Sequence, residues 1–269
     1  MSGKGFLKTA LVGRRTEVTR ALASNPLKFL YPRRRDAAWV YTTTFGGGLV
    51  AGDHIDLAVE IGDGTSCVLT SQSSTKVYKC PGGKITRQTT RATIGNEALL
   101  VIAPDPITCF AGSCYQQEQR LDLAMEGNLV LVDWLTSGRR ARNERWMFTR
   151  YSSRIDIRCD GRQRFLDSVL LDPTDGPLES PYRFGRFHCV ALLVIMGPVY
   201  ERESAAILEE ISRQPIEPGA SLIQTASGIP RGVVLRIAGV GTEQVGRELQ
   251  QRLEFLAPRL GGGPWSRKW

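Results

Sequence analysis

Short β-prone segments separated by turn residues run through the chain from residue 42 to residue 171. The clearest strands are residues 65–71, 84–94, 98–103, 119–125 and 129–135, and Gly, Pro, Asn and Ser gather between them. Closely spaced short strands with turn signals are typical of all-β proteins. We therefore predict a mostly β body. Threonine-rich polar strands such as ITRQTTRATI favour a stacked or sandwiched architecture with one solvated face.

Two segments carry the period-two pattern of half-buried strands. Residues 120–125 and 154–159 each alternate apolar and polar side chains, so each strand turns one face to the core. Asp160 and Gly161 follow the second segment. This dipeptide favours a two-residue hairpin turn, because both of its positions need positive φ.

The carboxy-terminal third changes from strand to helix patterning. Residues 201–213 and 242–257 have helical periodicity, with Thr242 as the predicted N-cap of the second helix and Pro258 as its stop. Residues 221–239, between the helices, predict two strands around a turn. The second helix carries one apolar stripe, which is formed by Val245, Leu249, Leu253 and Leu256.

No composition shift or linker divides the 269 residues. We predict a single domain over residues 1–269, with a β body to about residue 200 and a helix-containing part after it. No apolar run reaches the roughly 18 residues of a membrane helix, and the start MSGKGFLKTALVG lacks the apolar core of a secretory signal. The six cysteines are scattered without close pairing, as in reduced proteins. We therefore expect a cytoplasmic protein.

The net charge of +8 permits binding to nucleic acid, to an anionic membrane or to an acidic protein surface. The arginine clusters RRR and GRRARNER lack the interleaved aromatic residues of an RNA-recognition sheet. Such clusters are more often solvated loops than binding patches. A basic, β-rich nucleic-acid-binding protein stays the alternative function on composition alone.

The segment GGGLVAGD contains a G-x-G-x-x-A pattern at Gly46, Gly48 and Ala51, which resembles a dinucleotide-binding turn. Such a turn needs a helix directly after it, because the helix amino terminus holds the pyrophosphate. The next residues alternate as a strand instead, and the chain has no P-loop motif. We interpret the segment as a tight turn between two strands, with Gly47, Gly48 and Gly52 as its structural glycines.

Residues for catalysis or for a bound metal are equally sparse. His54 and His188 are the only histidines, too few for a three-histidine zinc site. No G-x-S-x-G elbow marks a serine hydrolase, and we predict that the chain is not an enzyme. Asp133 differs from the other acidic residues, because its surroundings LVLVDW imply burial. A buried carboxylate needs polar partners, a polar cavity or a metal.

Several stretches, in this order, resemble the family of the urease accessory protein UreD, called UreH in some species: NPLKFLYP, GGGLVAGD, LTSQSSTKVYK, IAPDPITCFAGSCYQQ and VDWLTSGRRARNERW. The forms STKVYK and PDPITCF are more similar to eukaryotic than to bacterial members. The resemblance implies a β-helix-like stack of short strands with two helices in the carboxy-terminal third. It also implies a non-enzymatic chaperone that binds apo-urease with a UreF-like protein and a UreG-like GTPase. Together these proteins deliver nickel to the urease active site.

By this resemblance nickel passes through the chain in transit, and no cofactor is tightly bound. Weak oxygen or nitrogen contacts suit such a path, since a tight four-ligand site would trap the metal. The candidate path residues are Asp53, Asp133 and Asp172. Cys80 and Cys109 are candidate thiolate contacts, for which packing is the more common role.

The chain ends in GGGPWSRKW, where we predict exposed Trp265 and Trp269 beside Arg267 and Lys268. A tail of this kind serves as a docking segment or stays disordered. The resemblance assigns no role to His54, which directly follows the glycine turn.

Overall fold

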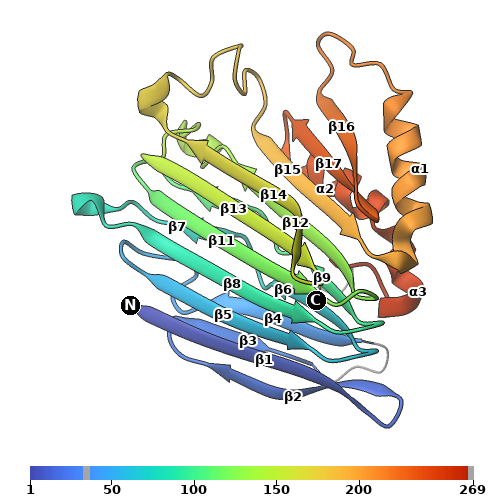
Figure 1. Ribbon diagram of the computed structural model, residues 1–269. Coiled ribbons are helices and arrows are strands. Elements are labelled where there is room, and N and C mark those ends of the chain that lie inside the picture. Colours follow the sequence, from blue (N-terminus) through green and yellow to red (C-terminus); the bar gives the residue numbers. More distant parts are fainter. Residues whose placement is uncertain (33–36, 266–269) are drawn as a thin grey trace.

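Two β-sheets packed face to face form the body of the molecule (Figure 1). The computed structural model describes residues 1–32 and 37–265. The first sheet has the strand order β14 (Arg162–Leu171), β13 (Arg150–Cys159), β11 (Cys114–Leu123), β8 (Thr86–Ile94), β5 (His54–Ile61), β1 (Ser2–Val12) and β2 (Arg15–Ala23). The second sheet has the main order β16 (Leu222–Ile229), β17 (Gly232–Gly239), β15 (Cys189–Met196), β12 (Asn128–Thr136), β9 (Leu99–Ile102), β6 (Ser66–Ser71), β4 (Ala38–Thr44) and β3 (Leu27–Leu30). The short strands β7 (Thr75–Val77) and β10 (Ile107–Cys109) pair with each other, and β10 also pairs with β12.

The chain alternates between the two sheets, so that each pass through both sheets forms one turn of a stack. β4 leads to β5, β6 to β8, β9 to β11 and β12 to β13. Within each sheet these successive strands run parallel. Parallel strands need crossover connections, which the strands of the opposite sheet provide here. The predicted mostly β fold, a β-helix-like stack, is confirmed.

In the first sheet, inward side chains at equivalent positions of neighbouring strands form rows, and these rows differ in polarity. Gln88, Gln117 and Ser153 are register partners on β8, β11 and β13, near the starts of these strands. Toward the ends of the strands the row is apolar and consists of Ile61, Ile94, Leu123 and Cys159. Packing this polar row directly against apolar side chains would cost free energy, because its polar groups would lose hydrogen-bond partners. The two sheets leave space between them at this polar end.

The outer face of the first sheet is the solvated face that the threonine-rich strand predicts. On β8, Arg87, Arg91 and Thr93 are exposed, whereas Thr90 is buried between the sheets. The predicted hairpin after β13 is also confirmed. Asp160 and Gly161 have φ values of 51° and 72°, and β13 pairs antiparallel with β14.

The amino-terminal strands β1, β2 and β3 have no counterpart in the sequence predictions. β1 pairs antiparallel with β2, and on its other side it runs parallel to β5. The partner β5 lies far along the chain, so a local pattern of apolar residues carries little information on this pairing.

Three helices, α1 (Glu201–Ser212), α2 (Thr242–Arg252) and α3 (Ala257–Leu260), cover the outer face of the second sheet (Figure 1). The predicted stripe on the second helix is confirmed, because Val245, Leu249, Leu253 and Leu256 are fully buried. The predicted ends of this helix are wrong. Gly241 is the N-cap in place of Thr242, and Pro258 lies in the first turn of α3, where its missing N–H costs nothing. No helix in the described part of the chain is long and apolar enough to cross a membrane.

Trp265 corrects the prediction of an exposed tail. Its ring packs edge-to-face on Trp134, with 6.2 Å between the centroids, at the core between the helices and the second sheet. The other predicted tail residues, Arg267, Lys268 and Trp269, lie outside the described residues.

Candidate functional site

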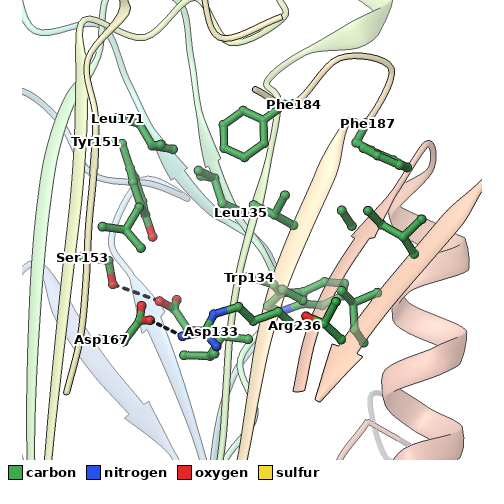
Figure 2. A pocket seen from close by; sticks show the side chains of 18 of the residues that line it. Asp133, Trp134, Leu135, Tyr151, Ser153, Asp167, Leu171, Phe184, Phe187 and Arg236 are labelled. Atoms are coloured by element: carbon green, nitrogen blue, oxygen red, sulfur yellow. Dashed lines mark hydrogen bonds and ion pairs between the residues drawn. The ribbon is translucent and has the colours of Figure 1, made fainter. Parts of the chain in front are cut away.

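Three cavities lie in a row between the sheets at the polar end of the stack. The outer cavity, of about 350 Å³, lies between β14 and the strands of the second sheet (Figure 2). The middle cavity has a volume of about 60 Å³ and the inner cavity of about 80 Å³. The inner cavity extends to Leu27 on β3, to Gly47 in the glycine turn and to the loop at Ser73. The row therefore runs across the stack from β14 to β3.

Asp133, on β12, lies where the outer and the middle cavity meet, because it lines both. Its Oδ2 accepts hydrogen bonds from Gln117 Nε2 at 2.7 Å and from Ser153 Oγ at 3.0 Å. In Figure 2 its carboxylate lies close to Ser153, at the base of the outer cavity. The carboxylate is therefore held by neutral donors of the first sheet, as buried polar groups require.

A second carboxylate lies on the wall of the outer cavity. Asp167 on β14 pairs with Arg236 on β17, with 2.8 Å between Oδ1 and Nη2, and this ion pair bridges the two sheets (Figure 2). The pKa of Asp133 is raised, first by burial and then by the charge of Asp167. The hydrogen bonds from Gln117 and Ser153 oppose this increase. Ionised Asp133 is thus costly unless a cation accompanies it.

The raised pKa of Asp133 predicts a pH-dependent gain in stability for Asp133→Asn. A carboxyl whose pKa is higher in the folded state stabilises the fold below its ordinary value of 3.8, and this contribution is lost as pH rises through the folded pKa. The loss amounts to about 1.4 kcal/mol for each unit by which the folded pKa exceeds the unfolded one. We therefore expect the free energy of unfolding of the variant, relative to wild type, to increase from pH 4 to pH 8. Urea denaturation at both pH values measures this difference, and an equal difference at both would contradict the raised pKa of Asp133.

The middle and inner cavities share one wall, which is formed by Thr42, Leu57, Thr75, Gln88 and Pro104. Two threonines and one glutamine supply hydroxyl and amide oxygens to this wall. Neutral oxygens of this kind contact a passing first-row metal ion only weakly. The row of cavities therefore has Asp133 where the outer and middle cavities meet and neutral oxygens where the middle and inner cavities meet, and Asp105 also lines the middle cavity between them.

The carboxylate of Asp53 forms hydrogen bonds within and beside the glycine turn. The carboxylate is 3% exposed; its Oδ2 accepts a hydrogen bond from the Val50 N–H at 2.9 Å, and its Oδ1 lies 2.8 Å from the Met1 amino group. His54 begins β5, and its backbone N–H bonds the Met1 carbonyl. Neither Asp53 nor His54 lines the three cavities.

The glycine turn connects β4 to β5 without a helix. Gly47 and Gly52 have φ values of +72° and +80°, in the left-handed region that favours glycine. A Cβ at Gly48 would lie 2.5 Å from the ring of Tyr78 and 2.7 Å from the Lys76 carbonyl oxygen. The pattern G-x-G-x-x-A thus serves close backbone packing here, since the helix that a pyrophosphate needs does not follow it.

Asp172 caps the 3-10 turn Pro173–Asp175 that follows β14. Its Oδ1 accepts the Thr174 N–H at 2.9 Å and the Thr174 hydroxyl at 2.6 Å. These hydrogen bonds lower the pKa of the carboxyl. Asp172 lies outside the walls of the three cavities.

Cys80 and Cys109 are buried, and their thiols are free. Burial raises the pKa of Cys109 to about 12, so this thiol is protonated at neutral pH and is a poor metal ligand. The sulfur of Cys80 accepts the backbone N–H of Cys114 at 3.3 Å. Within residues 1–32 and 37–265, no group of three or more His, Cys, Asp or Glu side chains is placed to hold a metal ion.

Gln117, Ser153, Asp167 and Arg236 belong to the site but are absent from the sequence predictions. The alternation of side chains along a strand could have identified Gln117 and Ser153, because each occupies an inward position of its strand. No local signal joins Asp167 to Arg236, since 69 residues separate them in the chain.

Comparison with known proteins gives matches along almost the whole chain. The sequence model of the UreD urease accessory protein family matches residues 2–269. Urease accessory protein UreD of Sorangium cellulosum is 44% identical and covers 100% of this chain and 85% of its own length. Urease accessory protein D of Arabidopsis thaliana is 37% identical over 95% of this chain and 97% of its own length. A urease accessory protein ureD-like protein of Schizosaccharomyces pombe, described as uncharacterized, is 29% identical over 84% of each chain. The chain therefore belongs to the UreD family of urease accessory proteins and has a role in urease maturation.

Proposed function

We propose that the chain is a non-enzymatic nickel-insertion chaperone of urease. It docks on the urease apoprotein with a UreF-like protein and a UreG-like GTPase, and it passes nickel through its interior toward the active site. Membership of the UreD family supports the maturation role, and these partners follow from the resemblance of the sequence motifs. The GTPase accounts for nucleotide hydrolysis, which leaves docking and transfer to this chain.

The row of three cavities is the observation that carries the proposal. A transit path must attract a divalent ion and release it, so it needs few ligands and no closed coordination site. Asp133 provides one carboxylate between the outer and middle cavities. Thr42, Thr75 and Gln88 provide neutral oxygens farther along. A hydrated ion leaving Asp133 would pass Asp105 in the middle cavity and then meet the weaker, neutral ligands between the middle and inner cavities.

Among the candidate residues, the proposal assigns the path to Asp133. Asp53 and Asp172 have local roles in a turn and in a cap, where backbone N–H groups already occupy their carboxylates. Cys80 and Cys109 have packing roles, in keeping with their burial. No tightly bound cofactor is part of the proposal, because nickel is cargo.

The cytoplasm is the compartment of the proposed function. All six cysteines carry free thiols, which fits a reducing compartment. The alternative, a nucleic-acid-binding protein, is not favoured, because the family match covers residues 2–269 and concerns urease.

Obstruction of the shared cavity wall tests the interior route. Thr75 lines both the middle and the inner cavity, so a Thr75→Trp side chain fills space that a passing ion needs. We expect the rate at which apo-urease acquires nickel, measured in a purified maturation reaction, to fall several-fold. Co-purification with urease should be retained, since the surface is unchanged.

Thr89→Trp is the matched control. Thr89 lies between the cavity-lining residues Gln88 and Thr90 on β8, so its side chain points to the outer face of the sheet. This variant should deliver nickel at the wild-type rate. Equal rates for both variants, with Thr75→Trp folded and bound to urease, would argue against an interior route.

A further inference from the structure

Three loops that are far apart in the sequence form one surface at the starts of β8, β11 and β13. They are residues 78–85, 110–113 and 137–149, and we call this surface the loop face. Backbone hydrogen bonds of 2.9 Å join the loops, from the Cys80 N–H to the Gly112 carbonyl and from the Gly112 N–H to the Met147 carbonyl. The backbones of the three loops are therefore held together, so the loop face is preorganised at the level of the backbone.

A charged clamp holds the centre of the loop face. Arg139 Nε donates to Glu144 Oε2 at 2.8 Å, and a second hydrogen bond joins the Arg139 guanidinium to Glu144 Oε1. Glu144 Oε2 also accepts the backbone N–H of Ala111 at 3.2 Å. The guanidinium of Arg139 lies 4.0 Å from the ring centroid of Phe110, a cation–π contact. The pKa of Glu144 is lowered, mainly by its bond to Arg139, so this carboxylate is already neutralised.

The remaining charge of the loop face is positive. Glu144 is the only acidic residue in the three loops. The exposed cations on or beside the loops are Lys79, Lys84, Arg140, Arg142 and Arg150. A concentration of one sign of charge on a rigid surface attracts a partner of the opposite sign and speeds its association.

An apolar hollow lies within this basic surface. It is lined by Tyr78, Phe110 and Met147 together with parts of the clamp, and Met147 is 55% exposed. Methionine adapts its shape to a partner, and arginine and methionine are enriched at protein interfaces. A rigid basic rim around an apolar centre has the anatomy of a protein-docking surface.

The aromatic residues argue against nucleic acid as the occupant. Single-stranded nucleic acid stacks its bases on exposed aromatic faces. Phe110 is 9% exposed and is covered by Arg139, and Tyr78 packs edge-to-face against it at 5.2 Å.

We propose that the loop face docks an acidic surface of a partner protein in urease maturation, and that the apolar hollow receives an apolar side chain of this partner. The inference rests on the proposed function for its choice of partners. Arg140 and Arg142 supply long-range attraction, because both are exposed on the turn between Arg139 and Glu144. Arg140 also donates a hydrogen bond to the Val240 carbonyl at 3.4 Å.

The test compares two double charge reversals. Arg140→Glu/Arg142→Glu changes the loop face, whereas Arg14→Glu/Arg15→Glu makes the same change of charge at the β1–β2 turn. That turn lies at the opposite end of the stack (Figure 1). The full chain is titrated with the urease apoprotein, with the UreF-like protein and with the UreG-like GTPase, at low and at physiological salt.

We expect Arg140→Glu/Arg142→Glu to weaken the binding of at least one of these proteins by about tenfold or more at low salt, with less weakening at physiological salt. The control should change each affinity less than twofold. If wild type binds but the two variants behave alike, the loop face is not the docking surface, while the proposed function stands. If wild type binds none of the three proteins, the proposed function itself fails. Binding of RNA that Arg140→Glu/Arg142→Glu alone abolishes, with protein binding intact, would instead assign the loop face to nucleic acid.

Discussion

Urease matured with an Asp133→Asn chain is expected to acquire nickel at least ten times more slowly than urease matured with wild type. The carboxylate lies at the joint between the outer and middle cavities, and it is held by Gln117 and Ser153. Asparagine keeps the size of the side chain but carries no negative charge. A divalent ion beside this half-buried position then loses its counter-charge, which costs several kcal/mol at an effective dielectric constant of about 20.

The measurement is the nickel bound per urease active site against time, in a reaction with purified partners. Asp172→Asn is the matched control, because it makes the same chemical change at a carboxylate that only caps a turn. It should deliver nickel at the wild-type rate. The assignment of the path to Asp133 would be contradicted if Asp133→Asn delivered nickel at the wild-type rate. It would also be contradicted if Asp172→Asn delivered nickel as slowly as Asp133→Asn.

The stability and the delivery of nickel are expected to change in opposite directions on this substitution. Burial raises the pKa of Asp133, so the ionised carboxylate lowers the stability of the empty protein near neutral pH. A more stable variant that delivers less nickel is the pattern of a functional residue, because structural residues lose both properties together.

The stack follows from the sequence because its strands are short, alternating and separated by turn residues. Strands such as β11 and β13 bury one face, so the period-two pattern marks both their position and their inward side chains. The hairpin at Asp160 and Gly161 is equally local, since positive φ at two successive residues favours this dipeptide. The apolar stripe from Val245 to Leu256 is local too, because its residues recur at helical spacing.

The site is harder to predict, because its parts are brought together by register. Gln117 and Ser153 share a row only because β11 and β13 are aligned in parallel. Asp167 meets Arg236 where the last strand of the first sheet approaches the second sheet. The surrounding apolar run predicts burial of Asp133, which is half-buried in the structure because it faces two cavities that the sequence does not predict. The pairing of β1 has no local signal either, because its parallel partner β5 is distant in sequence.

The central claim is that urease needs this chain to receive its nickel, and omission of the chain tests that claim most directly. Apo-urease, the UreF-like protein, the UreG-like GTPase, GTP and nickel are combined with and without the purified chain. Nickel per active site and urease activity are then measured on the same samples. If the chain only bound to the other proteins and took no part in nickel delivery, its omission would leave both quantities unchanged.

We expect omission to lower both nickel occupancy and activity by at least tenfold, because no other component of this reaction offers the path through the stack. Addition of wild type should restore both, and addition of Asp133→Asn should restore assembly without restoring the rate. Equal nickel occupancy with and without the chain would contradict the account.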